Sequence, residues 1–192
     1  MKLADLVEDF LVYLKRERNY SPNTLRSYSA DLTGFVDWAE ENAMGESPAT
    51  DFAPDRLREF LLHLRNGPED YAPRSVARKV SAVKSLFKYL LRSGVVTANP
   101  MTTVRTPRLP KHLPHYLEEH EVKLLLEIPS GSDLGALRDR AILETLYSTG
   151  ARASELVSMN LDGLDFSSGV TRITGKGRKE RLLFLGSYAI EA

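Results

Sequence analysis

Apolar side chains recur every three or four positions through the N-terminal half of the chain, which is the spacing of one face of an α-helix. The pattern predicts four helices, over about residues 3–18, 22–39, 54–66 and 73–93. Ser21 and Pro22 form a typical helix start, because a serine caps the first turn and a proline there loses no hydrogen bond. Gly94 is suited to end the fourth helix. The N-terminal part is therefore predicted to be entirely helical.

The fourth predicted helix has two opposite faces. On a helical wheel of about 100° per residue, one side carries cations and small hydroxyls: Arg74, Arg78, Ser81, Ser85, Lys88 and Arg92. The other side is apolar and holds Val76, Val80, Val83, Leu86, Phe87, Leu90 and Leu91. Lys79 falls at the edge of the apolar side, from which its long stem could reach solvent. The basic side extends for about 30 Å at a rise of about 1.5 Å per residue, which suits a groove of duplex DNA.

The C-terminal part mixes helical and strand-like patterns. Helices are predicted over about residues 118–126 and 134–147. Another helix follows the turn at Ser148-Thr149-Gly150 and runs to about Asn160. Residues 161–166 form a short irregular piece, and residues 170–174 and 181–185 are strand-like segments joined by a hairpin turn. The predicted fold class is mainly α, with a four-helix domain followed by an α+β domain that has a small β-hairpin sheet.

Between these parts, residues 103–114 contain a proline every three or four positions, together with Arg105, Arg108 and Lys111. Such a segment is expected to be extended and stiff. We therefore predict a helical domain over residues 1–104, a proline-rich basic linker over 105–116 and a second domain over 117–192. The linker fits a strap across a phosphate backbone and equally an ordinary interdomain linker with solubilising charges.

Composition narrows the classes of protein that the chain can represent. The 192 residues are 42% hydrophobic and include no cysteine, so a disulfide framework and a thiolate metal site are excluded. No apolar run approaches the length of about 20 residues that a membrane crossing needs, and acidic residues interrupt the first ten positions. His112, His115 and His120 lack the partners of a metal site. We expect a cytoplasmic protein without membrane contact, metal or other cofactor.

Charge is strongly segregated although the net charge is zero. From Tyr71 to Leu117 there is no Asp or Glu, and Arg and Lys together occur nine times. A basic tract of this kind indicates a polyanionic partner, and duplex DNA is the partner that its length favours. The alternative is an ordinary solvated face of a helix.

Two further cations stand in contexts that suit a phosphate. Arg152 follows Gly150 at a helix start, where a guanidinium can present paired donors to phosphate oxygens, and Glu155 lies on the same side of that helix. From spacing alone, an ordinary Arg–Glu surface pair explains this pattern as well. Lys176 lies between Gly175 and Gly177 at the predicted hairpin tip, where an ammonium could approach a ligand, although charged hairpin tips are common.

Four segments together resemble the tyrosine site-specific recombinases of the Xer type. Residues 20–32 and 78–90 are similar to the second and fourth helices of the core-binding domain of that family. Residues 149–156 match its first catalytic-arginine motif, and residues 175–181 match its catalytic-lysine hairpin. The resemblance covers nearly the whole chain, and the order of the motifs and the 24 residues from Arg152 to Lys176 make it specific.

The resemblance implies a SAM-like core-binding domain followed by an incomplete catalytic domain. Arg152 would clamp the scissile phosphate, Glu155 would support it and Lys176 would protonate the departing 5′-oxygen. Sister subunits would form a tetramer on two duplex sites. The DNA contacts implied by the resemblance and the basic tract are Thr24, Arg26, Arg74, Arg78, Ser81, Lys84, Ser85, Lys88, Arg92, Arg105 and Arg108.

The later motifs of the family have no counterpart in the sequence. The histidine–arginine pair and the nucleophilic tyrosine are missing, and Tyr188, 12 residues after Lys176, comes too early to be that nucleophile. Our leading hypothesis is a truncated recombinase of chromosome dimer resolution or element integration that binds DNA without cleaving it. The alternatives are a non-catalytic DNA-binding module, such as a natural truncation that occupies recombination sites, and a helical module that binds an acidic protein.

Overall fold

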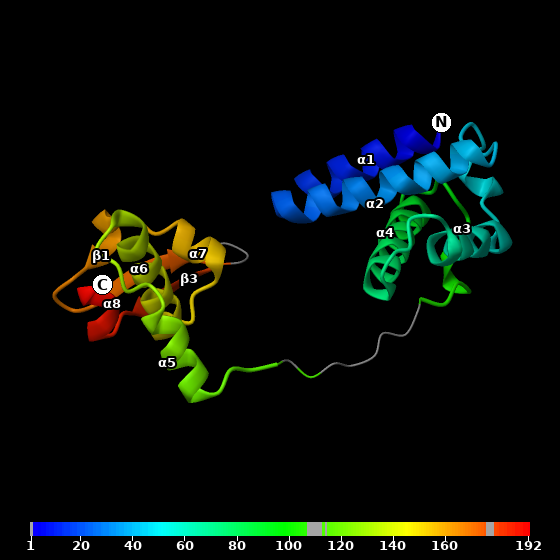
Figure 1. Ribbon diagram of the computed structural model, residues 1–192. Helices are drawn as coiled ribbons and strands as arrows, with labels where there is room; N and C mark the ends of the chain where they lie inside the picture. Colours follow the sequence, from blue (N-terminus) through cyan, green and yellow to red (C-terminus); the bar gives the residue numbers. More distant parts are fainter. Residues whose placement is uncertain (1, 107–112, 114, 176–178) are drawn as a thin grey trace. The chain divides into compact units, whose positions relative to one another are not determined.

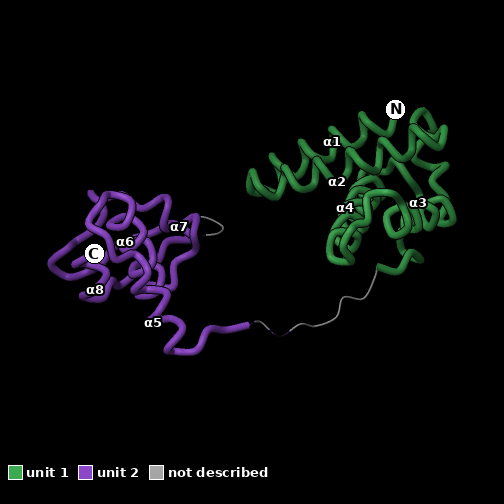
Figure 2. The backbone as a smooth tube through the Cα atoms, in the orientation of Figure 1, with its two compact units in different colours: residues 1–112 green, residues 113–192 purple. Residues whose placement is uncertain are grey.

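The computed structural model describes residues 2–106, 113, 115–175 and 179–192 (Figure 1). The chain divides into two compact units, unit 1 over residues 1–112 and unit 2 over residues 113–192, which are described separately (Figure 2). Helices dominate, and a small antiparallel sheet lies in unit 2. The predicted mainly α class is therefore confirmed. Within the described ranges, none of the helices combines the length and the apolar character that a membrane crossing needs.

Unit 1 contains the four predicted helices. They are α1 (Leu3–Arg16), α2 (Pro22–Glu41), α3 (Pro54–Asn66) and α4 (Pro73–Arg92), with two 3-10 turns at Ala49–Asp51 and Pro100–Thr102. The Ser21 hydroxyl accepts a hydrogen bond from the Thr24 amide at 3.3 Å, so it caps α2 as predicted. Gly94 has a φ of 75° directly after α4, a conformation in which a side chain would be strained.

The core of unit 1 forms where α4 packs against α1, α2 and α3. Val83, Leu86 and Phe87 of α4 are completely buried. The Phe87 ring lies 6.3 Å from the Phe35 ring and 6.0 Å from the Phe52 ring, measured between centroids. Each buried side chain of this kind contributes about 1.5–3 kcal/mol to folding. This packing fixes the orientation of α4, so the opposite side of the helix faces solvent.

Two residues of α4 depart from the predicted faces. Leu91, predicted to be buried, is 40% exposed, since it lies at the border of the apolar arc near the helix end, where the core stops. Lys79, predicted to reach solvent, is only 9% exposed. Its ammonium lies 3.7 Å from a carboxylate oxygen of Asp31 on α2, so a buried partner replaces solvent.

Unit 2 contains four helices and three strands within its described residues. The helices are α5 (Glu119–Glu127), α6 (Leu134–Thr149), α7 (Ala153–Val157) and α8 (Ser187–Glu191), and a 3-10 turn covers Leu161–Gly163. The strands are β1 (Leu164–Asp165), β2 (Val170–Thr174) and β3 (Glu180–Phe184), in the order β1-β2-β3. Both pairs are antiparallel, and Ile173 pairs with Arg181. The predicted hairpin is therefore one part of a three-stranded sheet.

Two predictions for unit 2 are corrected by the structure, and one helix was not predicted. The helix predicted to reach about Asn160 ends at Val157, and the Ser158 hydroxyl then donates to the Glu155 carbonyl at 2.9 Å. The segment predicted as irregular includes β1, which is too short at two residues to show a periodic pattern. The five residues of α8 were not predicted as a helix for the same reason.

The described part of unit 2 buries few apolar side chains. Only Ile173 and Leu183 are buried hydrophobic residues there, and α5 contributes no buried residue at all. Large apolar side chains of the helices are exposed instead, including Leu124, Leu134 and Leu137. An exposed apolar surface of this extent is typical of a contact face for a further segment or partner.

Candidate nucleic-acid interface and phosphate site

The solvent side of α4 carries the basic residues that the sequence analysis selected. Arg74, Arg78, Lys88 and Arg92 are exposed. Between these cations lie two small residues whose hydroxyls bond back to the helix: Ser81 donates to the Ala77 carbonyl at 2.7 Å, and Ser85 donates to the Ser81 carbonyl at 2.9 Å. Both side chains therefore add little bulk between the cations. The structure therefore places a row of cations along one side of the 20-residue helix α4. This basic row consists of Arg74, Arg78, Lys88 and Arg92.

Arg78 is held by a carboxylate at the contact between α2 and α4. Asp31 is 2% exposed and forms a salt bridge with the Arg78 guanidinium, which is itself 52% exposed. Lys79 lies on the other oxygen of the same carboxylate, and its ammonium sits 4.6 Å from the centroid of the Tyr71 ring. These three residues, Asp31, Arg78 and Lys79, form the Asp31 cluster. It was not predicted from the sequence, although an acidic and a basic residue at apolar faces of two helices could have indicated it.

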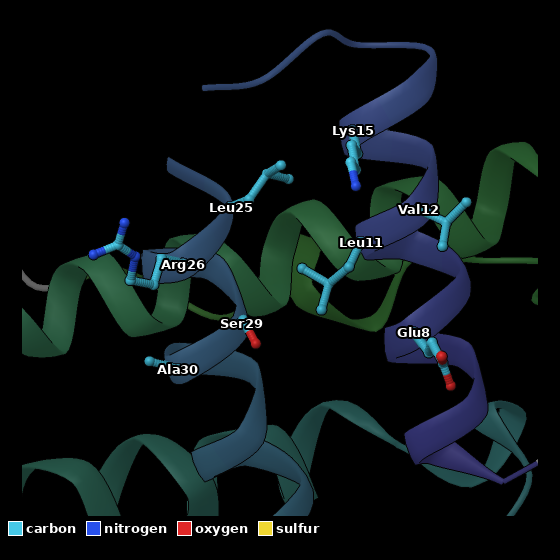
Figure 3. Close-up of a pocket in the computed structure, with 8 residues that line it drawn as sticks. All are labelled: Glu8, Leu11, Val12, Lys15, Leu25, Arg26, Ser29 and Ala30. Atoms are coloured by element: carbon cyan, nitrogen blue, oxygen red, sulfur yellow. The ribbon is translucent and has the colours of Figure 1, made fainter. Parts of the chain in front are cut away.

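Thr24 and Arg26, near the start of α2, lie in different surroundings. Thr24 lines a hollow of about 340 Å³ together with Tyr28, Arg78 and Ser81, beside the basic row. Arg26 lines a hollow of about 500 Å³ between α1 and α2 (Figure 3). Figure 3 shows apolar side chains such as Leu11 at this hollow, with the Arg26 guanidinium directed away from it. The structure thus brings Thr24 to the basic row and does not bring Arg26 there.

The C-terminal end of the basic row is aromatic as well as cationic. The Arg92 guanidinium donates to the Tyr13 hydroxyl at 2.9 Å and lies 5.2 Å from the centroid of the Tyr13 ring. Lys88, Tyr89 and Arg18 line the same hollow, which has a volume of about 250 Å³. Burial raises the pKa of the Tyr89 hydroxyl, so it stays protonated and able to donate. Arg18 was not selected from the sequence, because only the packing of the chain brings it to the same hollow as Lys88.

The remaining predicted DNA contacts are less closely associated with the row. The Lys84 ammonium donates to the Thr106 hydroxyl at 3.0 Å, so it links α4 to the chain that follows the 3-10 turn. Arg105 is exposed. Arg108 lies outside the described residues, as does Lys176 of the candidate phosphate site.

Arg152 is positioned by the first turn of α7, where it is the N-cap residue. Its guanidinium donates to Glu155 Oε1 at 2.9 Å, and its backbone amide donates to Glu155 Oε2 at 2.8 Å. The Glu155 side chain is 3% exposed, whereas the Arg152 side chain is 63% exposed. The predicted Arg–Glu pair is therefore not a surface pair, because its carboxylate is buried and its guanidinium faces solvent.

A second arginine contacts the same carboxylate. Arg181 of β3 donates to Glu155 Oε2 at 3.0 Å. Sequence analysis did not select Arg181, since its contact with Glu155 depends on the register of β2 and β3. The hydrogen bond from the Arg152 amide is the main cause that lowers the pKa of the Glu155 carboxyl, and the bonds from the two arginine side chains lower it further, whereas burial opposes them. Glu155 is thus held ionised between two cations.

The hairpin that carries the predicted lysine begins beside this cluster. A Cβ atom added to Gly175 would lie 2.9 Å from Glu155 Oε1, so only glycine allows the end of β2 to approach the carboxylate this closely. Gly175 also donates its amide to the Lys179 carbonyl at 2.7 Å, which closes the hairpin. The structure therefore brings the flank of the lysine hairpin to the same carboxylate that binds Arg152.

Chemically, two partly exposed guanidinium groups on one buried carboxylate suit the binding of a phosphate. Each guanidinium has five N–H donors, and its bond to Glu155 uses only part of them. The shared carboxylate fixes both groups before a ligand arrives, which lowers the entropy cost of binding an anion. Tyr188, by contrast, is a 75% exposed residue of α8 and lines a hollow with α5 and α6.

Comparison with known families identifies the class of each unit. The family described as "Phage integrase, N-terminal SAM-like domain" matches residues 7–94, and the one described as "Phage integrase family" matches residues 115–192. Unit 1 is thus a SAM-like domain of the integrase type, and unit 2 corresponds to the domain that defines the family. The chain belongs to the phage integrase family of tyrosine recombinases.

Curated relatives share this organisation over nearly the whole chain. "Tyrosine recombinase XerC" of Pelotomaculum thermopropionicum is 41% identical over 189 residues, which are 97% of this chain and 61% of that protein. The protein of the same name from Halalkalibacterium halodurans is 38% identical over 97% of this chain and 60% of its own length. The chain therefore spans about three fifths of the length of these relatives.

Solved structures share the fold at low sequence identity. A Tn1549 transposon integrase in complex with transposon right end DNA is 15% identical and has a TM-score of 0.71, covering 100% of this chain and 63% of that one. A lambda integrase dimer bound to a COC' core site is 16% identical, with a TM-score of 0.69 over 95% of this chain and 59% of that one. These similarities extend the family assignment to the fold.

Proposed function

We propose that this chain is the DNA-binding domain and the first part of the catalytic domain of a Xer-type, site-specific tyrosine recombinase. The observation that carries the proposal is the arrangement of Arg152 and Arg181 on the buried carboxylate of Glu155, beside the start of the lysine hairpin. A surface ion pair would not bury the carboxylate, whereas a preorganised anion site requires that its cations are held in place. The relatives named XerC support the same reading.

In the proposed reaction, duplex DNA lies against the basic row of α4 and brings a phosphodiester to Arg152. The Arg152 guanidinium stabilises the charge that develops on the phosphate oxygens when a nucleophile attacks. Glu155 keeps this guanidinium oriented, and Lys176 protonates the departing 5′-oxygen. The nucleophile is a tyrosine hydroxyl supplied by a segment that this sequence does not contain. In this proposal the chain thus supplies binding, charge stabilisation and the leaving-group proton.

The proposed partners follow from this role. Arg74 and Lys88 attract the phosphates of a duplex recombination site, and sister recombinase subunits complete a tetramer on two sites. The exposed apolar side chains of α5 and α6 provide a surface for the remainder of the catalytic domain. The protein acts on DNA in the cytoplasm, in chromosome dimer resolution or in the integration of a mobile element.

A nicked suicide substrate tests the division between binding and cleavage. The 192-residue chain should bind labelled duplex without forming a covalent adduct, since a phosphodiester attack needs an activated nucleophile. Denaturing gel electrophoresis after incubation measures the adduct, and a salt titration of the duplex affinity measures binding. An adduct that disappears in Tyr188→Phe would show that the chain carries its own nucleophile. Absence of duplex binding at low salt would contradict the proposed function.

A further inference from the structure

The Asp31 cluster contains two cations of different exposure on one carboxylate. Lys79 is 11% exposed in its side chain and Arg78 is 52% exposed, whereas Asp31 is 2% exposed. A buried carboxylate is strongly unfavourable unless it is paired, and Lys79 supplies a pairing charge within the protein. Tyr71 covers the other side of the Lys79 ammonium. Arg78 is therefore an additional partner at the surface rather than the charge that alone compensates Asp31.

The position of Arg78 differs from that of the other cations in the basic row. Its guanidinium is held by Asp31, which confines it to the contact between α2 and α4. In the described part of the chain, no carboxylate forms an ion pair with Arg74 or Lys88, so these side chains keep their full charge and their freedom. A mobile side chain suits a phosphate at any sequence, whereas a guanidinium held in place by a carboxylate is suited to a contact that depends on geometry.

The surroundings of Arg78 are suited to a base edge. The hollow of about 340 Å³ beside it is lined by the charged pair Asp31 and Arg78, by Ala82, and otherwise by neutral polar groups, namely an amide, hydroxyls and a ring, from Asn23, Thr24, Ser27, Tyr28 and Ser81. Such groups donate and accept hydrogen bonds without a net charge, which is what base edges in the major groove require. A guanidinium presents two parallel donors to the O6 and N7 atoms of guanine. The hollow therefore brings a guanidinium that is held in place together with neutral polar groups on one side of α4.

We propose that Asp31 is a positioning residue that makes Arg78 a reader of guanine in duplex DNA. Arg78 then determines sequence preference, while Arg74 and Lys88 provide attraction to phosphates that is independent of sequence. The inference rests on the proposed function, because it assumes that α4 meets duplex DNA. Beyond that function, Arg78 is the residue that reads the sequence, and the buried Asp31 carboxylate is the group that orients it.

The first experiment distinguishes recognition of a base by Arg78 from attraction by its charge, in the 192-residue chain. A randomised duplex library, selected with the wild-type chain, defines the preferred sequence. Arg78→Lys keeps the positive charge and removes the paired donors, so it should abolish the preference for guanine at one base pair. The affinity ratio between the preferred duplex and the duplex changed at that pair should fall on the order of 5- to 100-fold. The salt dependence of binding should stay the same, because no phosphate contact is lost.

Lys88→Ala is the matched control on the same helix face. It should weaken binding to all duplexes equally and reduce the log–log salt slope by about one unit, without a change in preference. If Arg78→Lys retains the guanine preference of the wild type, or if the wild-type selection shows no guanine at a fixed position, the inference is wrong and DNA binding itself stands. If the wild-type chain binds no duplex at all, the proposed function fails, and the inference fails with it.

Substitution of Asp31 tests the positioning role directly. Asp31→Asn alone leaves the Lys79 ammonium buried without its partner, so Asp31→Asn combined with Lys79→Met serves as the variant that keeps the interior neutral. Both should lose the guanine preference. The affinity for unselected duplex should rise in Asp31→Asn, which loses a negative charge near DNA, and stay equal in the double variant, which loses one charge of each sign. Lys79→Met alone should keep the preference, because Asp31 still holds Arg78. Retention of the preference in the double variant, with an unfolding temperature near that of the wild type, would overturn the role of Asp31.

Discussion

Each unit contains one buried carboxylate that holds two cations, and the two clusters differ in what they leave exposed. Asp31 joins two packed helices and has one buried and one exposed cation. Glu155 joins a helix start to a strand, and both of its arginines are partly exposed. One exposed guanidinium suits recognition of a single base edge, whereas two on a shared carboxylate suit an anion that presents several oxygens. The same electrostatic arrangement can thus serve reading in unit 1 and phosphate binding in unit 2.

The support beneath the two clusters also differs. The Asp31 cluster rests on a core that includes fully buried aromatic residues such as Phe35 and Phe87. The Glu155 cluster rests on a sheet whose described neighbours bury only Ile173 and Leu183 among the apolar side chains. Preorganisation depends on this support, because a charged group stays in place only if the elements that carry it do. Unit 1 should therefore keep its cluster fixed by itself, and unit 2 should do so less well.

The largest expected effect concerns the core of unit 1. Phe87→Ala should lower the free energy of unfolding of unit 1 by about 3–5 kcal/mol, because a fully buried ring leaves a cavity among packed neighbours. Leu183→Ala in unit 2 should cost near 2 kcal/mol, the lower end of the range of about 2–5 kcal/mol for such changes, since an exposed neighbourhood can relax. Hydrogen exchange of amides assigned to each unit measures both. Equal losses of unfolding free energy in the two variants would show that the two units hold their charge clusters equally firmly.

The next effect concerns catalysis in a full-length recombinase that carries this sequence. Arg152→Ala should reduce strand cleavage on the order of 10²- to 10³-fold, because the developing phosphate charge loses a preorganised donor. Lys176→Ala should also reduce cleavage, but a substrate with a 5′-thiolate leaving group, which needs no proton, should restore much of its rate. Single-turnover cleavage measures both. Equal rescue of the two variants, or of neither, would contradict their separate roles.

Much of unit 1 could be predicted from the sequence, because its signals are local. Ser21 and Pro22 specify the start of α2, and Gly94 specifies the end of α4 through its positive φ. The Asp31 cluster escaped prediction because Asp31 and Lys79 are 48 positions apart, and only the packing of α2 on α4 brings them together. Long-range contacts of this kind leave only a faint trace in the periodicity of a single sequence.

The candidate phosphate site was predictable in part for the same reason. Arg152 and Glu155 are three positions apart at a helix start, so their contact follows from helical geometry. Arg181 reaches Glu155 only through the register of β2 and β3, and the spacing of residues along the chain does not specify that register. The burial of Glu155 likewise depends on the sheet that covers it. Resemblance to a family therefore selected Arg152 and Lys176 as candidates, and geometry added Arg181 as a further candidate.

A smaller effect sharpens the contrast between the two carboxylates through pH. Hydrogen bonds lower the pKa of Glu155 in the folded protein, so the stability that its charge contributes is fully present above the ordinary carboxyl pKa. This contribution is lost as the pH falls through the lowered value of the folded state. The protection of the β2 and β3 amides, relative to their intrinsic exchange rate at each pH, should therefore fall below about pH 4.3 in the wild type. Glu155→Gln should exchange faster already at neutral pH, with a flatter pH dependence. An identical pH profile in both proteins would exclude Glu155 as the group that titrates.

The smallest expected effect distinguishes the free cations of the basic row from the cations that the protein itself pairs. Arg74→Ala should reduce the affinity for any duplex and lower the log–log salt slope by about one unit, because one phosphate contact disappears and its counterion is no longer released. Arg56→Ala is the matched control, since Arg56 lies on α3 and donates to Glu59 at 2.8 Å. It should leave both the affinity and the slope unchanged. Isothermal binding measurements at several salt concentrations compare the two variants. If both changed the slope equally, the attraction would come from the overall charge of unit 1, and the basic row of α4 would have no special role.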